Sequence, residues 1–550
     1  MKKSQTRLLA LLLVCCMMWS LTACAAADTT EQTEETIAIR IPEAVKYEKC
    51  TELGTPLADA RVRQALALAI DVDTVVETLH GDGAESAIWE DCAYDPEMAK
   101  ELLAEAGWPS EYVLDVVYAQ DDPQIEDLLN VIVYYWDAVG VQAEVRKITE
   151  DAEKQLWTVP EDPDGDSAVN WDLAICAVTD LNLQQFFGRF ASDSLRNSHT
   201  PAIEELDEAL AAGNVELARQ ILAEQVSFIP LLSQDGFVCV SDHLDPSAMS
   251  AGNGTYLYDK DVLNWITDRE DNTLYTGFVP AETELSPLEN PATLYHELVF
   301  DRLLYVDNEG NPADGLIAAH YALSDDAMAA EFTLREELFW HDGEPLTAED
   351  VKFTFELYLR CPDTNPVLKE LLEKLEGAEA FVDGDAKTCA GITVEENKVT
   401  FRFAEKAEDA LEIFSQWPVL PKHKLENVKP AKLMTHKFWK NPVGSGPFKV
   451  TELEAGKTCL LERWEDYHQA GEGNINFVRL NADDDSVAVL AALDLLDYGW
   501  GWSTDDAAYI GQLDHMQLLR VKRGCAVSFF INQFPHESYH TLEKSSQETQ

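Results

Sequence analysis

The stretch that decides the fold runs from Phe332 to Leu359 and reads FTLREELFWHDGEPLTAEDVKFTFELYL. Its first part, Phe332 to Trp340, has an apolar face and predicts a strand that ends in the turn His341-Asp342-Gly343. Thr347 then stands at an N-cap position, with Asp350 three residues later in the first turn of a predicted helix. The segment contains no obvious catalytic group, so it indicates structure rather than chemistry.

Length and composition bound the class of protein. A chain of 550 residues with 46% hydrophobic and 9% aromatic residues predicts a globular protein of two or three domains. The formal net charge of −59 argues against nucleic acid as a partner, because neutralising phosphates needs Lys and Arg. A solvated acidic surface accounts for this charge without a ligand.

The N-terminus has the features of an export signal. Three basic residues precede an apolar run over residues 8–21, which is too short to span a membrane. The run closes with Leu21-Thr22-Ala23-Cys24, which resembles a bacterial lipobox, where the Cys thiol accepts a diacylglycerol. We expect an exported protein, lipid-anchored through Cys24 to the outer face of the cell membrane or periplasmic, with residues 25–55 as a tether and possible extra strand. An ordinary secretory peptide with a chance Cys is the alternative.

Eight cysteines follow Cys24, and they are scattered without a C-x-x-C pair. This spacing does not make a metal site. Several lie in apolar runs such as LAICAV and FVCV, where a Cys behaves as a small core residue. We expect mostly free, buried thiols, no metal and no cofactor.

Residues 56–226 alternate between helix and strand patterns. Asp95 predicts a cap for a helix that has Pro96 at its first position and ends at Gly107. Alternating strands and helices of this length predict an α/β domain. The further helices expected are 56–70, one from near 123, 201–212 and 215–226, and the strands are 112–118, 141–148 and 171–178.

The stretch quoted first closely resembles the signature of the bacterial extracellular solute-binding proteins of family 5. These are the peptide- and nickel-binding lipoproteins of ABC importers, in which a strand like FTLR is followed by residues like WHDGEPLTAEDV. The resemblance implies a two-lobed α/β fold of the periplasmic-binding-protein type (type II), with a hinge between the lobes. It implies no enzymatic activity. The partners that it implies are a peptide or other small solute and the permease subunits of an ABC transporter.

The two halves of the chain resemble this family in reverse order. Segments resembling the family's C-terminal half come first: PLADARVRQALALAID, YDPEMAKELLAEAG and ILAEQVSFIPLL. From Thr273 onward the chain resembles the N-terminal half, and it ends at VSFFINQFP, a strand that in relatives leads into PLADARVRQAL-like sequence. We expect a circularly permuted chain; the alternative is an inert product of gene rearrangement. The expected parts are a second lobe (56–235), a first lobe (236–300 and 418–535), a subdomain with the signature (301–417) and a tail (536–550).

The resemblance also implies ligand contacts. Relatives carry a segment like GWGADYPDP, whose Asp pairs with the ligand's amino group, and the corresponding stretch is Cys176 to Asn182. Asp180 matches that Asp, and a carboxylate facing an ammonium is a sound anchor. We expect Asp180 and Asn182 to bind ligand. Capping of the helix behind it is the alternative for Asp180.

Aromatic residues near the C-terminus resemble a segment that lines the cleft in relatives. Tyr498, Trp500 and Trp502 fall on one face of an extended run. We expect these three and Leu285 to contact ligand, with packing in the core as the alternative.

His536 and His540 match the H-E-x-x-H pattern of zinc hydrolases. Pro535 precedes the pattern and no apolar helical stripe surrounds it, so we expect no zinc there. A zinc-dependent hydrolase remains the rival hypothesis. The sequence leaves the solute open among peptide, nickel chelate, haem and sugar.

Overall fold

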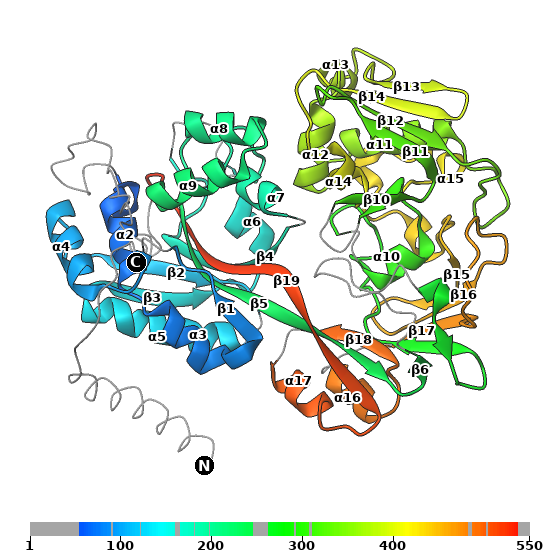
Figure 1. Ribbon diagram of the computed structural model, residues 1–550. Coiled ribbons are helices and arrows are strands. Elements are labelled where there is room, and N and C mark those ends of the chain that lie inside the picture. The colour runs from blue at the N-terminus through cyan, green and yellow to red at the C-terminus, as the bar shows by residue number, and fades with distance from the viewer. Residues whose placement is uncertain are drawn as a thin grey trace, which may run out of the picture. The chain divides into compact units, whose positions relative to one another are not determined.

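The computed structural model (Figure 1) describes residues 54–89, 92–120, 123–159, 166–180, 182–196, 199–245, 262–290, 293–306, 311–481, 487–501 and 504–536. The chain divides into two compact units, Met1–Val45 and Lys46–Gln550, and every described residue lies in the second unit. Cys24, Trp502 and His540 therefore lie outside the described residues, and their predicted roles are not tested by the structure.

One large sheet runs through the described residues. Parallel pairs occur on both sides of its middle, where the two longest strands pair antiparallel with each other, and one end of the sheet is antiparallel. In order, the strands are β15 (Phe448–Glu454), β16 (Thr458–Arg463), β17 (Phe477–Asn481), β8 (Thr273–Thr276), β18 (Tyr498–Gly501), β5 (Phe228–Ser241), β19 (Met516–Ile531), β4 (Leu173–Thr179), β2 (Val113–Tyr118) and β3 (Gln142–Lys147), with β1 (Ala84–Ser86) beside β5.

Strands β5 and β19 each cross from one hydrophobic core to another (Figure 1). They have 14 and 16 residues, which corresponds to roughly 50 Å of extended chain. Residues 228–232 and 527–531 belong to one core, whereas Val238, Val240 and Val521 belong to the other. We call the two parts the terminal lobe (residues 54–234 and 525–536) and the central lobe (residues 236–521).

The terminal lobe is built from both ends of the described chain. The indole of Trp136 donates to the carbonyl of Leu66 at 3.0 Å and lies 5.3 Å, between ring centroids, from Phe529. Residues 527–531 and the first helices of the described chain thus pack in one core, although they lie far apart in sequence. The helices of this lobe are η2 (Pro56–Ala58), α2 (Ala60–Leu68), α3 (Val72–His80), η3 (Gly81–Gly83), α4 (Pro96–Ala106), α5 (Pro123–Ala138), α6 (Ala152–Trp157), α7 (Leu183–Gly188), α8 (Glu204–Ala211) and α9 (Val215–Gln225).

Local sequence explains why these elements begin and end where they do. Helix α4 starts after Asp95, whose carboxylate accepts from the backbone N–H of Met98 at 3.0 Å, and Pro96 occupies its first turn. It ends at Gly107, whose φ of 73° is left-handed and suits glycine. The α/β prediction is confirmed.

The central lobe carries a second sheet in the order β11 (Ala318–Leu323), β12 (Ala329–Leu334), β14 (Lys398–Arg402) and β13 (Ile392–Glu395), all antiparallel. Two short pairs, β9 (Leu304–Val306) with β10 (Pro312–Gly315) and β6 (Leu244–Asp245) with β7 (Ile266–Thr267), complete its strands among the described residues. Its helices are α10 (Leu294–Val299), α11 (Ala348–Arg360), α12 (Pro366–Glu373), α13 (Ala378–Val382), α14 (Ala410–Phe414), α15 (Lys422–Leu425), η7 (Pro430–Lys432), η8 (Lys437–Lys440), α16 (Val487–Ala492) and α17 (Thr504–Ile510).

The signature stretch differs from its prediction in one respect. Strand β12 ends at Leu334 because Glu337 takes a left-handed φ of 58°, so the single strand predicted over 332–340 is too long. Phe339 is 40% exposed and only bridges to Pro345. The predicted helix is confirmed as α11, and the carboxylate of Asp350 accepts from the backbone N–H of Thr347 at 2.9 Å.

Candidate functional site

Asp180 follows β4 directly, at the carboxyl end of a buried strand. Ligands of α/β proteins commonly bind at such ends. Helix α7 begins three residues later, and its cap is Asn182, whose side-chain oxygen accepts from the N–H of Gln185 at 2.9 Å. The alternative reading of Asp180 as the cap of this helix is therefore wrong.

The carboxylate of Asp180 is 5% exposed and already holds two guanidinium groups. Arg189 donates to both of its oxygens, at 2.8 and 3.1 Å, and an Arg196 nitrogen lies 3.6 Å away. A bidentate Arg–carboxylate pair is strong and directional. Asp180 therefore has cationic partners before any ligand arrives.

Arg196 connects this cluster to the central lobe. Its guanidinium lies 3.0 Å from a carboxylate oxygen of Glu370 on α12. The same carboxylate accepts from the hydroxyl of Ser194 and the backbone N–H of Leu195, each at 2.9 Å. A network of four charged side chains thus links the terminal lobe to the central lobe, in the order Arg189, Asp180, Arg196 and Glu370.

A cavity of about 630 Å³ lies beside this network of charged side chains, between residues 184–211 of the terminal lobe and residues 370–409 of the central lobe. Carboxylates dominate its charged lining, and burial raises the pKa of one of them, Asp409. Such a cavity favours a solute that carries positive charge or many hydrogen-bond donors. Its charged lining residues include Arg196, Asp207, Glu370, Lys374, Glu408 and Asp409.

The other expected ligand residues lie mainly in packed surroundings. Tyr498, on β18, is fully buried, and its ring centroid lies 4.9 Å from that of Trp265. Leu285 is 2% exposed in the same core, and Trp500 is half-buried against it. The structure gives these side chains a packing role, and their contact with ligand stays a prediction.

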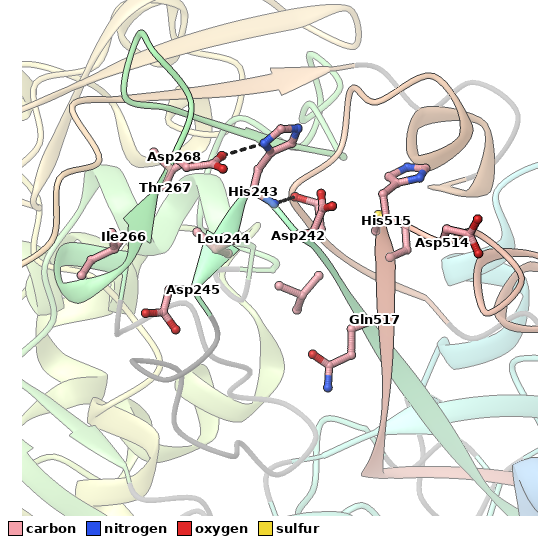
Figure 2. Close-up of a pocket in the computed structure, with 13 residues that line it drawn as sticks. Asp242, His243, Leu244, Asp245, Ile266, Thr267, Asp268, Asp514, His515 and Gln517 are labelled. Atoms are coloured by element: carbon pink, nitrogen blue, oxygen red, sulfur yellow. Dashed lines mark hydrogen bonds and ion pairs between the residues drawn. The ribbon is translucent and has the colours of Figure 1, made fainter.

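A second cavity, of about 430 Å³, was not expected from the sequence. Figure 2 shows His243 and Asp268 directed toward one another beside it, with the imidazole Nδ1 2.7 Å from the carboxylate. This hydrogen bond raises the pKa of His243. His515, directly before β19, lines the same cavity. The dipeptide Asp-His occurs at both 242–243 and 514–515, and this repeat is the one sequence signal that could have indicated the cavity.

His536 serves a structural contact. It is 2% exposed, its Nε2 lies 3.1 Å from Asp172, and its Nδ1 lies 3.0 Å from the carbonyl of Phe534. Asp172 is fully buried and also accepts from the hydroxyl of Tyr112 at 2.7 Å. Both imidazole nitrogens thus face acceptors. Among the described residues, no group of three His, Cys, Asp or Glu side chains could hold a metal ion.

The cysteines behave as small core residues. Among the described residues, Cys176, Cys361, Cys389 and Cys459 are buried, free thiols. Burial raises the pKa of Cys176 and Cys459 to about 12, which makes them poor nucleophiles.

Comparison with known sequences decides the family. The profile of the bacterial extracellular solute-binding proteins, family 5 (middle), matches residues 27–193 and 312–521. The chain belongs to this family. Family 5 consists of solute-binding proteins without enzymatic activity, and its members act outside the cytoplasm. The expectations of the family and of a non-enzyme are confirmed.

Individual curated relatives match this chain over part of their length. A putative ABC transporter peptide-binding protein of Brucella ovis is 28% identical over 195 residues, covering 35% of this chain and 34% of its own. A probable peptide-binding protein, YejA, of Agrobacterium fabrum is 32% identical over 175 residues, covering 31% and 26%. The chain thus spans about a third or less of the length of these curated relatives.

Two solved structures show partial similarity to this chain. The oligopeptide-binding protein AppA of Bacillus subtilis, in complex with a nonapeptide, is 25% identical with a TM-score of 0.34, covering 40% of this chain and 42% of that one. NikZ from Campylobacter jejuni, in complex with Ni(L-His), is 22% identical with a TM-score of 0.32, covering 41% and 42%. Among the described residues, no helix is long and apolar enough to cross a membrane.

Proposed function

We propose that this chain is an extracytoplasmic solute-binding lipoprotein that captures a peptide-like solute between its two lobes and delivers it to an ABC-type importer. The observation that carries the proposal is the family 5 match over segments of both lobes. The pair β5 and β19 supports it, because two long strands between two cores form a link about which lobes can close.

Asp180 is the proposed anchor for a ligand ammonium. Arg196 makes the longer of its two cationic contacts, 3.6 Å against 2.8 Å for Arg189. An incoming ammonium would therefore replace Arg196 more readily than Arg189. Asn182 is the proposed second polar contact, and the proposed aromatic and apolar contacts are Tyr498, Trp500, Trp502 and Leu285.

We also interpret the chain order as a circular permutation. Two features support this interpretation: the family profile matches two separate segments, and Ser167 donates its N–H to the carbonyl of Pro535 at 2.8 Å. An added Cβ on Gly54 would come within 2.8 Å of Pro535. If residue 535 were joined directly to residue 55, the segments of this lobe would thus follow one another in the order found in relatives. The lobe boundaries given with the sequence belong to this proposal, except that residues 525–535 are counted with the terminal lobe, in whose core they pack.

Titration calorimetry with defined peptides, and mass spectrometry of solutes that co-purify, test the binding function. We expect a peptide to bind in the micromolar range or tighter, without turnover. If nickel–histidine, haem or sugar binds and peptides do not, the peptide assignment is wrong. If no class of solute binds to the folded protein, the chain is the inert product of rearrangement.

The lipid anchor is tested separately. Replacing Cys24 by Ala should move the protein from the membrane fraction to the soluble fraction, because the thiol is the proposed site of acylation. Wild-type protein, extracted only with detergent, is the control. A Cys24→Ala variant that stays with membranes in the absence of detergent contradicts the lipoprotein assignment.

A further inference from the structure

The sign of the charge is reversed in a short segment of the central lobe. Residues 421–440 contain six of the 41 basic residues and one of the 100 acidic residues of the chain. All twenty residues are described, and they form α15, η7 and η8 on the surface of the central lobe. We call the exposed side of this segment the lysine face; it is made by Lys422, Lys424, Lys429, Lys432, Lys437 and Lys440.

The backbone holds these lysines in a fixed arrangement. Lys429 and Lys432 flank one 3₁₀ turn, and Lys437 and Lys440 flank the next. Residues three apart eclipse one another in a 3₁₀ helix, so each pair projects to one side. Leu433 and Trp439 are buried beneath the turns, and the Trp439 indole donates to the carbonyl of Leu433 at 2.6 Å. The segment is therefore anchored by apolar side chains below and presents ammonium groups above.

Three lysines of the face have carboxylate partners. Lys422 pairs with Glu349, Lys424 with Asp342 and Lys440 with Glu282, all through partly or largely exposed side chains. Pairs of this kind contribute little and exchange readily.

The other three, Lys429, Lys432 and Lys437, are exposed, and the described residues place no carboxylate within ion-pairing distance of them. They keep their charge available to a partner.

We propose that the lysine face docks on an anionic phospholipid membrane. This rests on the proposed lipoprotein function, because an anchored chain stays close enough to a bilayer for weak contacts to count. A net charge of −59 repels an anionic surface, so a basic face favours the orientation in which it meets that surface.

A lipid surface fits this face better than a protein does. Specific protein interfaces are centred on exposed aromatic or aliphatic anchors. The large apolar side chains of residues 421–440 are buried or half-buried, with Phe438 at 9% and Trp439 at 2% exposed. What remains outside is ammonium charge, which phosphate headgroups neutralise without shape complementarity.

The test uses full-length, unlipidated Cys24→Ala protein and sedimentation with phospholipid vesicles. We compare it with the same protein carrying Lys429→Gln, Lys432→Gln and Lys437→Gln. On vesicles with phosphatidylglycerol at about 0.05 M salt, the triple variant should bind at least about tenfold more weakly, and about 0.5 M salt should abolish the difference. On phosphatidylcholine vesicles the two should bind equally, which removes any contribution of the apolar N-terminal segment.

A matched control carries Lys387→Gln, Lys398→Gln and Lys406→Gln, the same change of charge elsewhere in the central lobe. It should retain the binding of the parent protein. Equal losses in both triple variants, or no preference for phosphatidylglycerol, overturn the proposal. So does binding only to membranes that contain a permease, which would indicate a protein partner. Since the assay uses unlipidated protein, its failure is distinguishable from failure of the lipid anchor.

Discussion

The two lobes bury similar kinds of side chain but draw them from the chain in different ways. The central-lobe core lies within one continuous stretch, from Val238 to Val521. The terminal-lobe core combines residues 57–232 with residues 527–531, so its first helix and its last strand are more than 450 residues apart. The entropic cost of closing a loop grows only with the logarithm of its length, so this arrangement lowers the stability of the lobe only slightly. Contacts between residues so far apart in sequence do, however, slow folding.

The interior of each lobe differs in character from the contact between the two lobes. Each interior is apolar, with Phe332, Phe355, Phe401 and Phe414 packed edge to face in the central lobe. Between the lobes, the side chain of Glu370 makes charged and polar contacts with the terminal lobe. Apolar packing fixes each lobe, whereas charged contacts between lobes can be exchanged for a ligand. The predictions below test this difference.

The largest effect should come from the last part of β19, which completes the core of the terminal lobe. Replacing the fully buried Phe529 by Ala removes its contact with Trp136 and should lower the free energy of unfolding by about 3–5 kcal/mol. Phe401→Ala in the central lobe is the matched change. We expect calorimetry to show each variant lowering the transition of its own lobe. If both lower one common transition equally, the lobes unfold as a single unit.

Asp180→Asn should affect both stability and binding. It removes the charge that pairs with Arg189 and Arg196, at a cost of about 1–3 kcal/mol in the empty protein. If Asp180 also anchors the ligand, peptide affinity should fall by about ten- to a hundredfold. Asp127→Asn, at an exposed position of the same lobe away from the cavity, is the control. Lost stability with unchanged affinity would restrict Asp180 to a structural role.

His536 should make the terminal lobe sensitive to pH. Burial lowers the pKa of this imidazole, but Asp172, with smaller contributions from the Phe534 carbonyl and Asp115, raises it by more, so the net shift is upward. A group with a raised folded-state pKa stabilises fully below its unfolded value of about 6.5 and loses that contribution as the pH rises through the folded value. Thermal unfolding should therefore show stability falling above neutral pH. His536→Gln should flatten this dependence, and an unchanged pH profile would contradict the assignment.

The smallest effect should be local to the contact between the lobes. Glu370→Gln replaces a charged acceptor for the Leu195 N–H by a neutral one, which weakens that bond by about 1 kcal/mol. Hydrogen exchange at Leu195 should become about fivefold faster, because exchange reports local opening. Glu373→Gln, one turn later on α12, should leave it unchanged. Equal acceleration in both variants would mean that the charge of Glu370 does not hold the lobes.

The sequence by itself determined the features that depend on neighbours along the chain. Asp95, Pro96 and Gly107 set the limits of α4, and Thr347 with Asp350 set the start of α11, because caps act over three or four residues. The signature and the family 5 resemblance also follow from local order, since they are patterns of consecutive residues. Free, buried thiols were predictable from the apolar runs around them.

Tertiary structure alone decided which charges meet. Asp180 finds Arg189 and Arg196, and Arg196 finds Glu370 from 174 residues away. No local pattern indicates such pairs, because they depend on how separate elements pack. Tyr498 illustrates the same limit: alternation predicts a shared face with Trp500, but only the packing of Trp265 against it shows that this face is interior. Local sequence determines elements, whereas burial and pairing are properties of the assembled chain.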